Sequence, residues 1–187
     1  FSFRTERECN RRLPPHLRKN VQVLSFRRLS HAIFKQLGGL AGTYADNIAK
    51  TVMMHLAMRE VQDGLQIYQN SIGKDGFSGL MLQTVDEFKN STITPEQFEL
   101  VSSQIPDGKL KQKMQDVSLL YTTYTAMLGN SYRDPSDDLT QATERAKGSR
   151  FFENTHVFLY GFVSFSQQQF RMLSLMLEQG DVTIALN

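Results

Sequence analysis

The sequence contains few side chains at spacings that support catalysis. None of its four histidines has a carboxylate at the spacing of a helical zinc-protease site, and its single cysteine, Cys9, can form neither an internal disulfide nor a cysteine-based zinc site. The glycine-rich stretch 38–42 lacks the lysine of a phosphate-binding loop, and Lys74 is followed by Asp75 instead of Ser or Thr. Segment 76–79 lacks the glycine spacing of a nucleophile elbow. We therefore expect an ordinary thiol at Cys9 and no catalytic residue, metal or cofactor in this chain.

Basic and aromatic residues gather near the start of the chain. The 187 residues include 21 Lys or Arg and 19 Asp or Glu, for a net charge of +2. Residues 1–38 hold nine Lys or Arg against Glu6 and Glu8, so the rest of the chain is net acidic. The run from Phe26 through Arg27 and Arg28 to Lys35 is compatible with nucleic-acid binding. A solvated helix face explains the same charges.

The composition indicates a folded protein without a membrane span. Hydrophobic residues make up 40% and charged residues 21% of the chain, which supplies a core and argues against disorder. No apolar run approaches the roughly 18 residues of a membrane helix, and the N-terminus is too charged for a secretory signal. One cysteine favours a reducing compartment, so we expect a cytoplasmic location. Because the chain begins with Phe in a helical pattern, we interpret it as part of a longer protein.

A strand, a turn and a helix are expected to position the basic run. The apolar, β-branched segment 21–25 follows Pro14-Pro15 and is predicted to form a buried strand. From Phe26 the apolar residues recur at helical spacing, and Gly38-Gly39 ends the pattern.

The middle of the chain is predicted to be helical. A long helix is expected from Tyr44 to about Ile72, with an apolar face that contains Ile48, Val52 and Leu56 and is widened by the core methionines Met53, Met54 and Met58. Thr94 and Gln97 form a capping-box pattern around Pro95. Further helices are predicted over 77–88, from 95 onward, over 109–128 with Tyr121 and Tyr124 in the core, and over 137–146.

The end of the chain returns to strand, helix and strand. His156–Tyr160 is a continuous apolar run, typical of a strand covered on both faces in a parallel sheet. An amphipathic helix ends at Gly180, and 182–186 is a second strand. Segments 21–25 and 157–160 are expected to pair in one parallel sheet. The predicted fold class is α/β, predominantly helical overall, with a parallel-sheet part over 1–40 and 151–187 and a large all-helical insertion over 41–150.

Two segments resemble motifs of UvrD/Rep-like superfamily 1 helicases. Residues 23–30 resemble the segment in which a strand ends in a Thr/Ser-Phe turn that touches single-stranded DNA. Residues 157–169 resemble the Walker B segment, where Asp holds magnesium and Glu polarises water. Those two positions are Tyr160 and Gly161 here, and neither can hold a metal or act as a base. The resemblance implies a P-loop-helicase-like fold with a degenerate Walker B motif.

Together these segments resemble the N-terminal, inactivated helicase-like domain of the AddB (RexB) family. The family pattern Leu-Ser-Phe-x-Arg-Leu stands at 24–29, and Gly-Phe-x-x-Phe-x-x-x-Gln stands at 161–169. Residues 93–98 and 110–124 also resemble the family's helical insertion, so the resemblance covers nearly the whole chain. Two positions depart from it: Tyr160, where family members often keep Asp, and His31, where Trp is common.

The resemblance implies a role in double-strand-break repair by homologous recombination. Each family member is one subunit of an ATP-dependent helicase/exodeoxyribonuclease, which is a hydrolase. It forms a heterodimer with a subunit of the AddA/RexA type. The AddA-type subunit hydrolyses ATP and translocates, while the AddB-type subunit contributes a nuclease domain, a 4Fe-4S cluster and recognition of the Chi sequence. ATP, magnesium and cluster binding are expected elsewhere in the full-length protein, so this chain itself is expected to be inactive.

The candidate DNA site lies in the two loops that follow the predicted strands, because α/β proteins bind ligands at the carboxyl ends of parallel strands. A guanidinium with aromatic planes suits the bases of single-stranded DNA, where stacking is worth about 1–3 kcal/mol per base. The candidate residues are Ser25, Phe26, Arg28 and His31 in the first loop and helix, and Phe162 and Phe165 in the second. Core packing is the alternative role for the phenylalanines. A helical protein-interaction module without direct DNA contact is the alternative function; the missing carboxylates argue against an active helicase.

Overall fold

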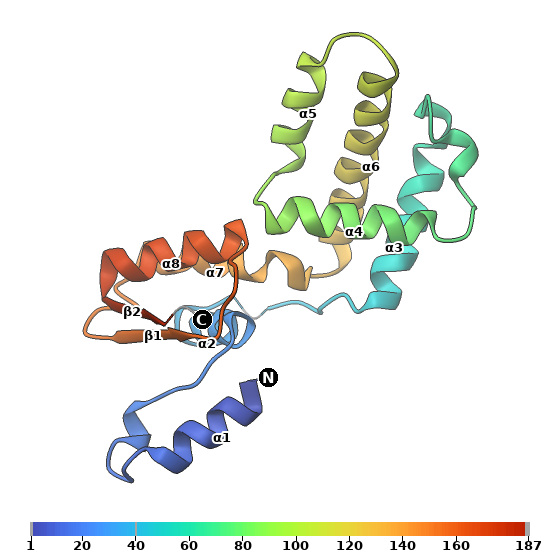
Figure 1. Cartoon of the computed structure of the whole chain (residues 1–187). Helices are drawn as coiled ribbons and strands as arrows, with labels where there is room; N and C mark the ends of the chain where they lie inside the picture. The colour runs from blue at the N-terminus through green and yellow to red at the C-terminus, as the bar shows by residue number, and fades with distance from the viewer. Residues whose placement is uncertain (1, 40, 186–187) are drawn as a thin grey trace. The chain divides into compact units, whose positions relative to one another are not determined.

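The chain folds into two compact units, each mostly helical (Figure 1). The structure is a computed structural model that describes residues 2–39 and 41–185. The helical unit contains residues 41–137 and 164–168, and the terminal unit contains residues 1–40, 138–163 and 169–187. Across the described ranges, no helix combines the length and apolarity that a membrane span requires. The predicted fold class is confirmed: the chain is mostly helical with a small parallel sheet.

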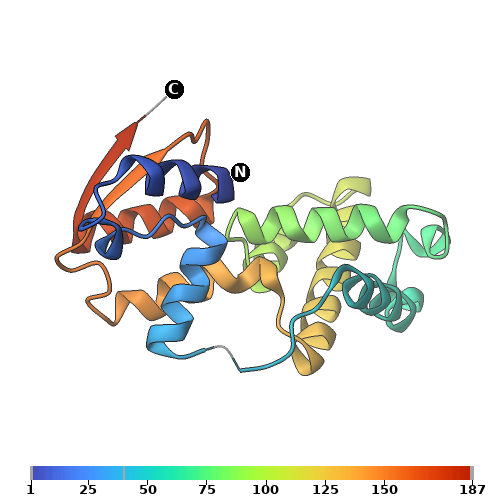
Figure 2. The same ribbon diagram turned by 90° about the horizontal axis from the view of Figure 1, so that it is seen from below.

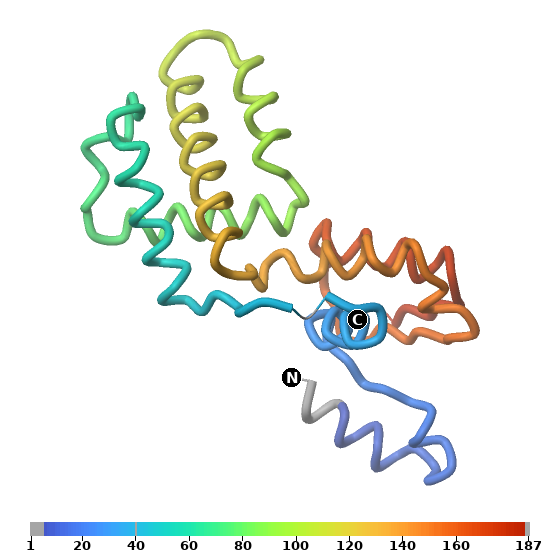
Figure 3. Tube along the Cα trace, turned by 180° about the vertical axis from the view of Figure 1, so that it is seen from behind, coloured from blue at the N-terminus to red at the C-terminus, as the bar shows by residue number. Residues whose placement is uncertain are grey.

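The helical unit is built around one long helix, α6 (Lys109–Ser131), which packs against α3 (Asn47–Glu60) and α5 (Pro95–Gln104). Helix α4 (Phe77–Asn90) packs against α3, an arrangement that Figures 1 and 3 show from opposite sides. Single-turn 3-10 helices occupy Gln62–Gly64, Gln69–Ser71 and Pro135–Asp137. The capping box at the start of α5 is confirmed, since Thr94 and Gln97 each bond the other's backbone N–H.

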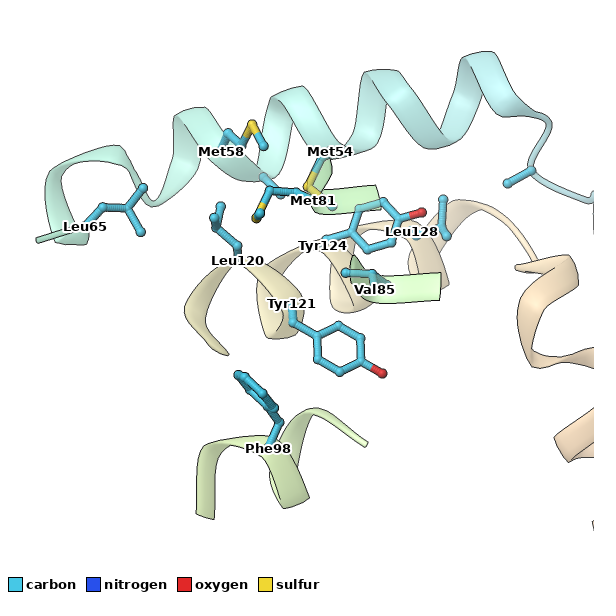
Figure 4. Packing of buried hydrophobic residues seen from close by; sticks show 12 residues of the cluster. Met54, Met58, Leu65, Met81, Val85, Phe98, Leu120, Tyr121, Tyr124 and Leu128 are labelled. Atoms are coloured by element: carbon cyan, nitrogen blue, oxygen red, sulfur yellow. The ribbon is translucent and has the colours of Figure 1, made fainter. Parts of the chain in front are cut away.

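The core of the helical unit lies between α3, α4 and α6 (Figure 4). Met54 and Met58 of α3 are fully buried against this core, as are Tyr121 and Tyr124 of α6. The predicted core roles of these residues are confirmed.

The predicted apolar face of α3 is wrong for the side of the helix opposite the methionines. Ile48, Val52 and Leu56 are 75%, 49% and 43% exposed. The sequence pattern is apolar on two sides of this helix, and the helical unit covers the methionine side.

The predicted helix from Tyr44 to Ile72 is too long. Asp46 caps α3 by accepting the backbone N–H of Ala49 at 2.7 Å, and α3 ends at Glu60. Beyond it, the buried carboxylate of Asp116 on α6 accepts the backbone N–H groups of residues 66, 67 and 68 at 2.8–2.9 Å. These donors bind a side chain instead of helical carbonyls, which keeps the segment out of a regular helix.

The terminal unit joins both ends of the chain. It contains α1 (Ser2–Arg12), a 3-10 turn (Arg18–Asn20), α2 (Phe26–Leu37), α7 (Asp138–Lys147), β1 (His156–Tyr160), most of α8 (Gln167–Gln179) and β2 (Asp181–Ala185). Helix α7 packs against α2, so the structural boundary of this unit falls near 138, whereas the sequence placed it near 150.

Strands β1 and β2 pair in parallel from His156 opposite Asp181 to Tyr160 opposite Ala185. Helix α8 connects them and lies over one face of the pair, as Figures 1 and 2 show. At the tight turn into β2, the backbone N–H of Gly180 donates to the carbonyl of Met176 at 2.9 Å. The predicted strand-helix-strand order is confirmed, while residue 186 lies outside the described residues.

Two predictions about strands are wrong. The backbone is extended at both ends of segment 21–25, at Val21 and Ser25, but the segment pairs with no strand in the described part of the chain, so the expected pairing with 157–160 is absent there. Val21 is 40% exposed, and a strand requires a neighbour to bond its backbone. β1 is also not covered on both faces: Phe158 and Tyr160 are 71% and 69% exposed, because α8 covers one face only.

Candidate nucleic-acid interface

Helix α2 begins at a capped turn that orients the first group of candidate residues. The Ser25 hydroxyl accepts the backbone N–H of Arg28 at 3.3 Å, and the backbone of Ser25 is extended. The apolar side of α2 is held by Leu29, Ile33 and Phe34, which are buried. Arg28 and His31 consequently lie on the exposed side of the helix.

The two candidate loops meet at a pair of aromatic rings. The ring centroids of Phe26 and Phe162 are 5.5 Å apart and the rings are inclined by 65°, an edge-to-face contact. Both side chains are half-buried. Gly161 has a φ of +77°, a left-handed conformation that turns the chain immediately after β1 and precedes Phe162. The structure thus brings together residues that are 136 positions apart in the sequence (162 minus 26).

Arg28 is held by a carboxylate that no sequence signal indicated. Its Nη1 donates to Oε2 of Glu6 on α1 at 2.7 Å. The hydrogen bond raises the pKa of Arg28 and lowers the pKa of Glu6. Both side chains remain in contact with solvent, at 45% and 32% exposure, so the pair is a surface ion pair of small energetic weight.

The other predicted site residues are placed as follows. His31 Nε2 lies 3.7 Å from Oδ2 of Asp138 on α7, whose side chain is 5% exposed. Phe165 is half-buried and belongs to the segment 164–168 of the helical unit, whereas Phe26 and Phe162 belong to the terminal unit. Cys9 is a half-exposed free thiol on α1.

A groove of about 350 Å³ runs along the exposed side of α2. Four of its lining residues are basic in type, and two are apolar. They are Leu24, Arg27, Arg28, His31, Ala32 and Lys35. Arg27 and Lys35 were not among the predicted site residues, although their four-residue spacing around His31 already indicates one helix face.

Tyr160 ends β1 and Gly161 follows it; the sequence resemblance predicts that these two positions form a degenerate Walker B motif. The Tyr160 side chain is 69% exposed. Because Gly161 adopts a positive φ, a residue with a Cβ at this position would be strained. Among residues 2–39 and 41–185, no three His, Cys, Asp or Glu side chains gather into a group that could hold a metal ion.

Comparison with known proteins gives one consistent result. A family model described as "ADDB, N-terminal" matches residues 1–187. Relatives named as the B subunit of an ATP-dependent helicase/deoxyribonuclease include those of Clostridium tetani, 27% identical over 190 residues and the whole chain, and Clostridium acetobutylicum, 30% identical over 179 residues and 96% of the chain. The protein of Clostridium botulinum strain Loch Maree is 28% identical over 187 residues. The chain spans 16% of the length of each of these relatives.

Proposed function

The chain belongs to the AddB N-terminal family, and from this premise we propose that it is a non-catalytic, DNA-binding domain of a helicase-nuclease subunit. In this proposal the domain binds single-stranded DNA and recognises the Chi sequence during repair of double-strand breaks by homologous recombination. A partner subunit of the AddA type supplies ATP-driven translocation in the bacterial cytoplasm. The relatives are named as one subunit of an enzyme, which supports the existence of such a partner.

The observation that carries the proposal is the contact of Phe162 with Phe26 at the start of α2, the helix that also carries Arg28. Two aromatic rings from separate loops offer surfaces on which unpaired bases stack. Arginine donates two parallel hydrogen bonds to guanine, which is the usual arginine contact for base recognition. Strain at Gly161 against any side chain supports the non-catalytic part of the proposal, because a general-base carboxylate fits poorly there.

The test is an Arg28→Ala substitution in the full-length protein with its partner subunit. We expect the affinity for single-stranded DNA that contains Chi to fall about tenfold or more, the scale of one good arginine-base contact. Affinity for strands without Chi should change much less. Arg11→Ala is the matched control, since Arg11 is an exposed arginine of the same unit whose partner is Glu8 on its own helix. Equal effects on both kinds of strand would contradict base recognition by Arg28.

A second candidate function is docking of another protein on α3. The exposed residues Ile48, Val52 and Leu56 recur every four positions and form an apolar stripe on a helix whose other side is already buried. A domain that binds only protein makes no phosphate contacts, so it would contribute no salt-dependent binding of single-stranded DNA. A salt series with labelled single-stranded DNA therefore separates the two functions.

A further inference from the structure

The groove on α2 continues well beyond Arg28. Arg27, His31 and Lys35 recur every four residues and follow one side of the helix. With a rise of about 1.5 Å per residue, their backbone positions are about 6 Å apart, and the row is about 12 Å long. This interval is similar to the separation of successive phosphates in an extended single strand.

The charges along the groove remain positive after neighbouring carboxylates are included. Glu6 contacts Arg28, and Asp138 lies near His31. Arg27 and Lys35 are exposed, and within the described ranges neither takes part in an ion pair. These two side chains are therefore available to an anion from solvent, and both are of cationic, hydrogen-bond-donating types.

The groove also has apolar lining residues. Leu24 and Ala32 line it and are half-buried. A lining that combines apolar and cationic side chains accommodates the sugars of a nucleotide chain while the cations contact its phosphates. A row of evenly solvated lysines and arginines without a groove would lack this shape.

We infer that Arg27 and Lys35 bind the phosphates of a single DNA strand that runs along α2, away from the bases held near Arg28 and Phe26. This inference rests on the proposed function, because it extends the same site. Lys35 is seven residues beyond Arg28, about 10 Å along the helix, so it contacts a different nucleotide. Arg27 and Lys35 are thus assigned to affinity that is independent of sequence, and Arg28 to recognition of the bases.

The inference is tested by the salt dependence of binding. The full-length protein with its partner subunit is titrated without ATP against labelled oligo-dT of about 20 nucleotides, over a series of KCl concentrations. Arg27→Gln and Lys35→Gln should each reduce the slope of log affinity against log salt by about 0.7, the value for one phosphate contact on a single strand. At about 0.1 M salt this corresponds to roughly fivefold weaker binding for each variant. Lys19→Gln is the matched control, because Lys19 is an exposed lysine of the same unit outside the groove.

A second probe separates phosphate contacts from base contacts. An abasic strand of equal length should show the same loss with Arg27→Gln and Lys35→Gln, whereas a loss confined to oligo-dT would overturn the assignment to phosphates. The variants Arg27→Lys and Lys35→Arg keep the charge and should keep the wild-type slope; thermal melting of all variants checks that they fold.

Failure of the inference and failure of the proposed function give different results. If Arg28→Ala weakens binding to Chi-containing strands while Arg27→Gln and Lys35→Gln keep the wild-type slope, the phosphate row is wrong and the proposed function stands. If Arg28→Ala, Arg27→Gln and Lys35→Gln all bind like the wild-type protein, both are wrong.

Discussion

Replacement of Asp116 by asparagine should destabilise the helical unit through the segment that follows α3. The Asp116 side chain is 1% exposed, and its two oxygens accept three backbone N–H groups. Oδ1 accepts from Gln66 at 2.9 Å, and Oδ2 accepts from Ile67 at 2.8 Å and from Tyr68 at 2.9 Å. Asparagine keeps one of these two acceptors and directs an NH2 group at the donors of the other.

The magnitude follows from the number of donors that lose an acceptor. One or two part-buried N–H groups lose their acceptor, and each costs about 1–3 kcal/mol. Since the donors are adjacent and the segment can relax, the losses are less than additive, and we expect a free energy of unfolding lower by about 3 kcal/mol. This is a large part of the stability of a small folding unit, which is about 5–15 kcal/mol in total.

Urea unfolding and amide hydrogen exchange measure this effect together. The amides of Gln66, Ile67 and Tyr68 should lose protection before those of α6. Asp107→Asn is the matched control, because the Asp107 side chain is 95% exposed and pairs with Lys111 four residues along the chain. An Asp116→Asn protein with the unfolding midpoint of the control and protected amides at 66–68 would refute the argument.

Three other substitutions have defined outcomes. Burial raises the pKa of Tyr124, so the folded state holds the phenolic proton more tightly than the unfolded state, and stability falls as pH rises above about 10. The Tyr124 hydroxyl has no hydrogen-bond partner among the residues described, so Tyr124→Phe should keep the stability of the wild-type protein at pH 7. The same substitution should flatten the loss of stability in melting curves between about pH 8 and 11. A Cβ on Gly180 would lie 2.5 Å from a backbone carbonyl oxygen, so Gly180→Ala should lower the free energy of unfolding by about 2 kcal/mol or more. Gly79→Ala is the control, because the space around a Cβ at Gly79 is open, and this substitution should not destabilise the fold. Glu6→Gln releases Arg28 and should strengthen single-stranded DNA binding about two- to fivefold in a titration; a gain that persists in the Arg28→Ala background would show that Glu6 acts elsewhere.

Helices whose signals are local could be predicted from the sequence. The capping box of Thr94 and Gln97 uses side chains and backbone groups only three residues apart, so a short window contains all of its information. The same holds for the start of α2 at Ser25. Helical ends that depend on distant residues could not be predicted: the carboxylate that ends the helical path after α3 is Asp116, about fifty residues away.

The face of α3 shows a different kind of limit. Ile48, Val52 and Leu56 have the same helical period as Met54 and Met58, and both rows are apolar. Periodicity predicts that a helix has an apolar side, but it does not say which of two apolar sides the neighbouring helices cover. Here the packing of α6 and α4 buries the methionines.

The strand prediction at 21–25 failed for a related reason. β-Branched residues favour an extended backbone, and Val21 and Ser25 at the ends of segment 21–25 are extended, but a sheet also requires a neighbouring strand at the correct register. β1 has this neighbour in β2, which follows it through a single helix. In the candidate site, the contact between Phe26 and Phe162 likewise depends on the tertiary fold. The ion pair of Glu6 with Arg28 leaves no pattern in the sequence, because exposed ion pairs have no fixed spacing.

The turn at Gly161 lies at a position that the sequence resemblance matches to a catalytic carboxylate, and it immediately precedes the aromatic contact of Phe162. In the helicases that the segment resembles, a glutamate follows the aspartate at the end of the Walker B strand. Here the second position has a φ of +77°, which glycine adopts readily and glutamate adopts only with strain. This backbone conformation turns the chain so that the next residue, Phe162, reaches the ring of Phe26. A glutamate at 161 would strain this turn by about 1–3 kcal/mol. The loop conformation that accompanies the aromatic pair therefore gives a physical reason for glycine at this position.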